Sequence, residues 1–129
     1  MSPSIPYARR VFFWAGIYGL VALLPMCFLE ARIGQVFPPA LNHPENYYGF
    51  LAVALAWQLA FLAISRDVVR FRPLMPVAVA AKFAFVATVL ALVLQERIAT
   101  AAAAPAVAGL LIGLLFLVAW RRPPTDAWA

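Results

Sequence analysis

The chain is poor in the side chains that carry most enzyme chemistry. Its 129 residues include one cysteine, one histidine and five acidic side chains. A haem held by two histidines and a thiol oxidoreductase built on a cysteine pair are therefore excluded, and Cys27 has no partner for an internal disulfide. No glycine-rich phosphate loop, serine elbow or metal-spaced histidine pair occurs. Without a nucleophile and base pair, we predict no catalytic residues and no cofactor, and an enzyme is the least favoured class.

Charged residues are scarce as well. They make up 12% of the chain, while 66% is hydrophobic, against about a quarter charged and about half apolar in soluble domains. Four apolar stretches, residues 11–29, 47–65, 74–94 and 98–120, are long enough to cross roughly 30 Å of hydrocarbon. We predict an all-α membrane protein, an up-down bundle of four transmembrane helices at about 10–29, 44–65, 74–95 and 100–120. Residues 1–129 would then form a single domain.

The arginines lie at the ends of the apolar stretches, where they indicate topology. Seven lie on one side of the predicted membrane: Arg9, Arg10, Arg66, Arg70, Arg72, Arg121 and Arg122. The other side carries Arg32 and Arg97. Because loops rich in basic residues stay in the cytoplasm, we expect both termini inside and the seven arginines near lipid headgroups. The net charge of +5 forms no patch or stripe, so we expect no nucleic-acid partner.

Prolines and acidic residues predict where the helices begin and end. Residues 1–8 look like a loose tail before a first helix that begins near Arg9, and Pro25 is expected to kink the last turn of that helix. Asn42-His43-Pro44-Glu45 is typical of a helix start, and Asp67 is expected to cap a short turn. Pro105 either kinks the fourth helix or begins it.

Small residues recur every three or four positions in the apolar stretches. The set predicted to pack helices is Ala15, Gly19, Ala52, Ala56, Ala60, Ala84, Gly109 and Gly113. In lipid, helices associate where small residues allow close contact. Gln58 and Lys82 lie opposite the alanine stripes of the second and third helices. Either the small faces pack inside the bundle and the polar faces look outward, or the polar faces look inward and the alanine stripes are left for oligomer contacts.

Three polar side chains are expected at one depth in the membrane. Counted from the cytoplasmic helix ends, Tyr18, Gln58 and Lys82 lie about seven or eight residues in, or roughly 10 to 12 Å. A lysine hydrogen-bonded by Gln58 and Tyr18 could hold a carboxylate or a lipid phosphate. Alternatively, Lys82 leans toward the helix N-terminus and snorkels to the headgroups. Both interpretations stay open.

The predicted outer surface offers a second group of polar side chains. Glu30, His43, Glu45 and Glu96 could in principle bind a divalent metal. No two of them have the i, i+3 or i, i+4 spacing of ligands on one helix, and Glu45 already complements the start of a helix. We therefore predict no metal site and keep the four residues as a candidate outer-loop site.

Short motifs between residues 43 and 85 resemble those of a known group. They are His43-Pro-Glu, Tyr47-Tyr-Gly-Phe50, Ala54-Leu-Ala-Trp57-Gln58, Arg66-Asp67, and Arg70-Phe-Arg-Pro-Leu-Met75 followed by Lys82. Together they look like the motifs of small uncharacterised bacterial four-helix integral membrane proteins, and the chain is similar to DoxX-like proteins in layout only. The resemblance implies four crossings of a bacterial inner membrane and brings no assigned activity. In that group an acidic residue often precedes the lysine, whereas this chain has Ala81 there.

Two functional hypotheses follow. The first is an interaction protein of the lipid bilayer, either a homo-oligomer or an accessory subunit of a larger membrane complex. The second is a carrier or binder of an anionic lipophilic ligand centred on Lys82, with Gln58 and Tyr18. The first requires a protein partner and the second a small ligand, and neither requires a cofactor.

Overall fold

A computed structural model describes residues 4–29, 31–32, 35 and 43–122 of the chain. Its four long helices are α1 (Ser4–Leu23), α3 (Pro44–Arg66), α4 (Met75–Leu94) and α5 (Ala104–Arg121). Short 3₁₀ helices lie at Pro25–Phe28 (η1), Arg72–Leu74 (η2) and Thr100–Ala103 (η3). The described part of the chain has no strand, which confirms the predicted all-α fold. All four helical spans are long and apolar enough to cross a membrane, as expected of a multi-pass membrane protein.

Helix α1 differs most from its prediction. It begins at Ser4 instead of near Arg9, so the predicted loose tail is wrong for residues 4–8. Pro6 does not interrupt it, because backbone donors in the first turn have no partner within the helix. At its other end the α-helix stops at Leu23 and Pro25 begins η1. The expected disturbance of the last turn therefore takes the form of a 3₁₀ segment.

The other helix ends follow the local signals. Pro44 occupies the first turn of α3. The backbone N–H of Arg70 donates to Asp67 Oδ1 at 3.1 Å, which closes the predicted turn. Pro105 lies in the first turn of α5, directly after η3, so it begins the fourth helix and does not kink it. Glu96 has a φ of 58°, a left-handed conformation that lets the chain reverse between α4 and α5.

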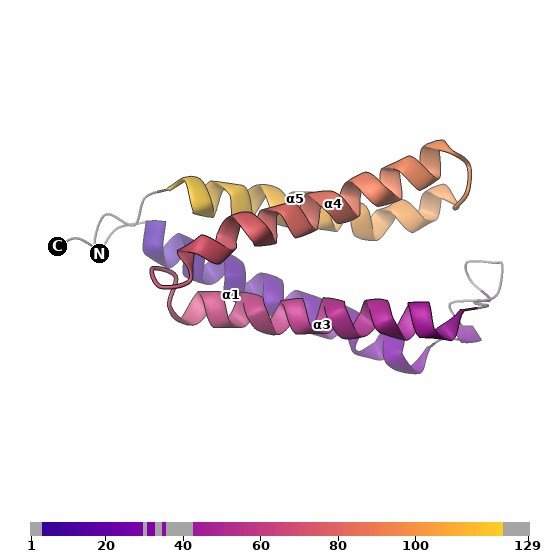
Figure 1. Cartoon of the computed structure of the whole chain (residues 1–129), viewed down its shortest axis with the longest axis horizontal. Helices are drawn as coiled ribbons and strands as arrows, with labels where there is room; N and C mark the ends of the chain where they lie inside the picture. Colours follow the sequence, from indigo (N-terminus) through magenta and orange to yellow (C-terminus); the bar gives the residue numbers. More distant parts are fainter. Residues whose placement is uncertain (1–3, 30, 33–34, 36–42, 123–129) are drawn as a thin grey trace.

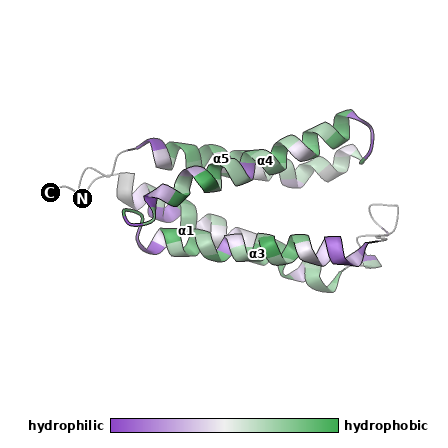
Figure 2. Cartoon of the chain, viewed as in Figure 1, coloured by the Kyte–Doolittle hydropathy of each residue, from purple (hydrophilic) through white to green (hydrophobic). Residues whose placement is uncertain are grey.

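The helices form two hairpins. α1 packs along α3, α4 packs along α5, and α1 also contacts α5. The hairpins lie together at the end of the molecule where α1 begins and α5 ends, and they diverge toward the opposite end (Figure 1). Hydrophobic residues predominate along the helices, and hydrophilic ones gather at their ends (Figure 2). We call the end where α1 begins and α5 ends the arginine-rich end. Its arginines are Arg9, Arg10, Arg66, Arg70, Arg72, Arg121 and Arg122.

An aromatic core joins the two hairpins near the arginine-rich end. Phe12 of α1 and Phe116 of α5 stack with 4.2 Å between ring centroids, and Phe61 of α3 packs edge-on against Phe116 at 4.9 Å. Such ring pairs contribute about 0.5–1.5 kcal/mol beyond the area they bury. Smaller buried side chains surround the rings: Ala8, Ala15, Ile64, Val68, Met75, Ala78, Val79 and Ala119. All four helices therefore meet around three phenylalanines.

Buried positions on α1 and α5 alternate by three and four residues. On α1 they include Ala8, Phe12, Ala15 and Gly19. On α5 they include Ala106, Gly109, Gly113 and Phe116. This spacing is typical of left-handed helix bundles, in which one stripe of each helix faces its neighbours. Ala15, Gly19, Gly109 and Gly113, which the sequence predicts to pack helices, are all buried.

The alanine stripes of α3 and α4 face the other way. Ala52, Ala56 and Ala84 are exposed and Ala60 is only partly buried, so placing the three exposed alanines in the packing of this bundle is wrong. Gln58, on the opposite face of α3, is only 5% exposed. Hydropathy does not determine which face of α3 or α4 points into the bundle, because lipid tails are as apolar as the alanines. Of the two arrangements left open, the chain adopts the one with polar faces inward.

Candidate functional site

Lys82 points from α4 into the bundle. Its Nζ lies over the ring of Phe61, 5.3 Å from the ring centroid. Because Phe61 is 1% exposed and belongs to the aromatic core, the ammonium group lies against the core of the bundle. A cation over an aromatic face gains about 0.5–2 kcal/mol. Among the described residues, no acidic side chain or hydrogen-bond acceptor is paired with this ammonium group.

Gly113 makes room for the lysine. A Cβ added at this position of α5 would lie 3.1 Å from the Cβ of Lys82, and 3.5 Å from the ring of Phe83. These distances are close to the limit for carbon atoms in contact, so the missing side chain of Gly113 is what allows α4 and α5 to pack closely at this point. The lysine stem therefore lies between α4 and α5, and its charged group extends toward α3.

Gln58 lies at the contact between α3 and α1. Its Nε2 donates to the carbonyl oxygen of Ala54, one turn earlier, at 2.9 Å. Its Oε1 is buried and has no hydrogen-bond partner. A Cβ added at Gly19 would overlap the carboxamide, so the absence of a side chain at Gly19 is what lets Gln58 fit between the helices. This oxygen lies where a Cβ of Gly19 would be, so the unsatisfied end of the amide faces α1 and its burial costs free energy.

Tyr18 does not join these two residues. It is 49% exposed on α1, whereas its neighbour Gly19 faces Gln58. Consecutive helix positions point about 100° apart, so a tyrosine beside an inward-facing glycine is turned to the outside. Of the predicted polar layer, the structure turns Lys82 and Gln58 inward, each against a glycine of the neighbouring helix, without a hydrogen bond between them.

The arginines of the arginine-rich end have different partners. Arg72 donates from Nη2 to the carbonyl of Trp120 at 2.6 Å and from Nη1 to that of Arg122 at 2.9 Å. The prediction that the Arg72 guanidinium meets lipid phosphates is therefore wrong, because the last carbonyls of α5 lack partners within the helix and bind it instead. Arg70 lies over Phe71 and Arg122 over Tyr7, at 5.5 and 4.6 Å from the ring centroids.

The candidate outer-loop site is not assembled by the described residues. Glu30 lies outside them. His43 Nδ1 and Glu45 Oε1 are 3.3 Å apart and exposed, beside the start of α3, while Glu96 lies in the turn between α4 and α5. Within the described ranges, no group of three or more histidine, cysteine or acidic residues could hold a metal ion.

Two residues of the site were not found from the sequence. Phe61, which receives Lys82, belongs to an apolar span in which aromatic residues carry no directional signal. Gly16 also packs closely, although less so than Gly19: a Cβ there would lie 2.8 Å from Cγ of Leu62 and 3.0 Å from the carbonyl oxygen of Gln58. Its spacing of three from Gly19 places both on one helix face, and this signal could have identified it.

Comparisons of the chain with protein families, curated proteins and solved structures found no match. The resemblance to small four-helix bacterial membrane proteins therefore stays a prediction. Any function must be argued from the side chains of this chain and their arrangement, because a helical bundle serves many unrelated functions.

Proposed function

We propose that this protein is an oligomerising or accessory subunit of a bacterial inner membrane, with its arginine-rich end in the cytoplasm. The direction rests on the distribution of basic residues. Seven arginines lie at the end where α1 begins and α5 ends, whereas only Arg32 and Arg97 follow the opposite ends of the helices. Basic residues near the ends of transmembrane helices favour the cytoplasmic side.

The observation that carries the proposal is the outward direction of the alanine stripes. Ala52 and Ala56 on α3, and Ala84, Ala87 and Ala91 on α4, are exposed. Small residues let helix backbones approach closely, and close packing is a main source of helix association in lipid. Within the chain, glycines of α1 and α5 already serve this purpose. The alanine faces of α3 and α4 therefore remain available to a second copy or to a larger membrane partner.

The test is the oligomeric state of stripe variants. Ala56→Leu and Ala84→Leu place a bulky side chain where close approach is required, and each should shift the protein from an oligomer toward a monomer. Ala22→Leu is the matched control, because Ala22 is an exposed alanine of α1 outside both stripes. Size-exclusion chromatography with light scattering in a mild detergent measures the particle mass, and blue-native electrophoresis of solubilised membranes detects larger partners.

Two results would contradict the proposal. One is a strictly monomeric wild-type protein with no co-purifying membrane protein. The other is an equal loss of association in Ala22→Leu, since that would place the contact outside the stripes. Cross-linking between copies of Ala56→Cys, with Cys27 replaced by alanine, gives independent evidence of the face involved.

A second candidate function is the binding of an anionic lipophilic ligand at Lys82. It is favoured by the ammonium group over Phe61, which has no acidic partner among the described residues. An ionisable side chain at this depth is a functional hypothesis by default, because its burial costs free energy that a structural role rarely requires. The aromatic ring and the lysine together fit a carboxylate with an apolar tail.

Oleate is a suitable probe for this second function. Native mass spectrometry of the detergent-solubilised protein should detect bound oleate, and Lys82→Met should lose it while Lys82→Arg keeps part of it. Arg97→Gln is the control, because it removes one positive charge outside the bundle. Unchanged oleate binding in Lys82→Met would exclude the site, and equal losses in Lys82→Met and Arg97→Gln would indicate charge attraction alone.

A further inference from the structure

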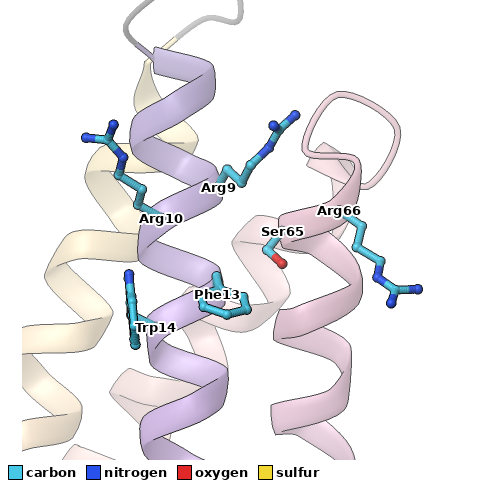
Figure 3. Close-up of a pocket in the computed structure, with 6 residues that line it drawn as sticks. All are labelled: Arg9, Arg10, Phe13, Trp14, Ser65 and Arg66. Atoms are coloured by element: carbon cyan, nitrogen blue, oxygen red, sulfur yellow. The ribbon is translucent and has the colours of Figure 1, made fainter.

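A hollow of about 450 Å³ lies at the arginine-rich end, between α1 and the last turn of α3. Its lining residues are Arg9, Arg10, Phe13, Trp14, Ser65 and Arg66. Arg9 extends into the space between the two helices, where Ser65 also points, while Arg10 and Arg66 extend to either side (Figure 3). The rim of the hollow thus carries three arginines, of which Arg9 is directed between the helices, and Phe13 and Trp14 of α1 add aromatic side chains to the lining.

The three arginines of the rim differ from others at the same end. Arg70, Arg72 and Arg122 contact aromatic rings or helix-terminal carbonyls of the protein itself. By contrast, Arg9, Arg10 and Arg66 are exposed, and no acidic side chain among the described residues lies within ion-pair distance of them. Three arginines that line one hollow and have no acidic partner among the described residues create a local positive field that favours an anion.

The aromatic wall points to the kind of anion. Phe13 and Trp14 are 41% and 63% exposed and pack edge to face, with 5.1 Å between ring centroids. Exposed aromatic rings one turn from arginines are typical of the boundary between headgroups and acyl chains. Ser65 gives its proton to the carbonyl of Leu62 at 2.6 Å, so its oxygen can only accept a further hydrogen bond. The hollow thus presents charge and apolar surface together, as a phospholipid does.

We propose that this hollow binds the phosphate of an anionic phospholipid from the leaflet at the arginine-rich end. Guanidinium groups pair with phosphate oxygens through two parallel hydrogen bonds. Arg9 extends between the two helices, and Arg66 of α3 lines the same hollow with an exposed side chain. The glycerol backbone and the first acyl carbons lie along Phe13 and Trp14. A zwitterionic lipid fits less well, because its own cation would face the three arginines. The site is separate from Lys82 and independent of the alanine stripes.

The experiment measures lipid selectivity. The protein is reconstituted in nanodiscs that contain one part phosphatidylglycerol and four parts phosphatidylcholine. Native mass spectrometry then releases the protein from the nanodisc and counts the lipids of each kind that it retains. The wild type should retain phosphatidylglycerol preferentially, and Arg9→Gln and Arg66→Gln should each lower this retention about fivefold. Arg121→Gln is the matched control, because Arg121 is an exposed arginine at the same end that does not line the hollow.

A second variant avoids any effect of charge on topology. Trp14→Ala keeps every arginine and removes part of the aromatic wall, and it should weaken retention of phosphatidylglycerol without changing the helix content. Equal retention in wild type and in Arg9→Gln, or equal losses in Arg9→Gln and Arg121→Gln, would overturn the proposal in favour of diffuse attraction. Displacement of the lipid by millimolar inorganic phosphate would also overturn it, because the hollow would then be a site for the free ion.

Discussion

Replacing Gly19 by alanine is expected to destabilise the protein more than the same change at other glycines. A Cβ at Gly19 would overlap the amide of Gln58 and lie 2.7 Å from its Cγ. The glutamine has little freedom to move, because it is 5% exposed and its Nε2 is bonded to the carbonyl of Ala54. The extra methyl group must therefore push α1 from α3 or force the glutamine out of its conformation.

The expected magnitude follows from two opposing effects. Overpacking of a tight contact costs about 1–3 kcal/mol, and the better helix propensity of alanine returns at most about 1 kcal/mol. Gly19→Ala should therefore lower the free energy of unfolding by about 1–2 kcal/mol. Gly49→Ala meets no atom within 4 Å and should cause no loss. Gly113→Ala, with its nearest contact at 3.1 Å, should fall between the two.

The assay is reversible unfolding in mixed micelles. Titration with sodium dodecyl sulfate, followed by tryptophan fluorescence and circular dichroism, gives the free energy of unfolding of each variant. In the double variant, Gln58→Ala removes the clashing amide and should relieve the cost of Gly19→Ala by at least about 1 kcal/mol. If Gly19→Ala is as stable as Gly49→Ala, or if Gln58→Ala gives no relief, then α1 and α3 do not approach as described.

Two further predictions use the same titration. Phe116→Ala should cost about 3–5 kcal/mol, because its ring is fully buried between two other phenylalanines, whereas Phe28→Ala should change little at 85% exposure. A small loss at Phe116 would mean that the hairpins are joined elsewhere. Arg72→Gln should cost about 1 kcal/mol by releasing the last carbonyls of α5. Arg121→Gln is its control. Equal stability of the two variants would mean that Arg72 acts on membrane topology and does not stabilise the fold.

The helices, and the ends marked by Pro44 and Asp67, could be predicted because their signals are local. A charge-free run such as residues 47–65 is recognisable without any knowledge of its neighbours. Pro44 and Asp67 act on the backbone within a turn of their own positions, and the structure has them where local chemistry expects them. For Pro105 the sequence allows two local roles, a kink within the fourth helix or the start of that helix. The structure places it in the first turn of α5, after a 3₁₀ segment, so it begins the helix.

The candidate site was only partly predictable. The sequence identified Lys82 and Gln58 as the polar residues at mid-helix, but a long lysine stem can follow its own helix to the headgroups or cross to another helix. The choice depended on Phe61, whose ring lies in the core and receives the ammonium group. Tyr18 was grouped with them by depth alone, and depth does not specify on which side of a helix a residue lies.

The sequence by itself determined the four spans, the uneven distribution of arginines and the positions of the glycines. Only the tertiary structure decided which face of each helix looks inward. In water, burial of apolar surface would make that choice, but lipid accepts an alanine stripe as readily as the protein interior does. The inward faces are therefore set by shape. Gly19 leaves space for Gln58, Gly113 leaves space for Lys82, and the stacked rings of Phe12 and Phe116 join α1 to α5.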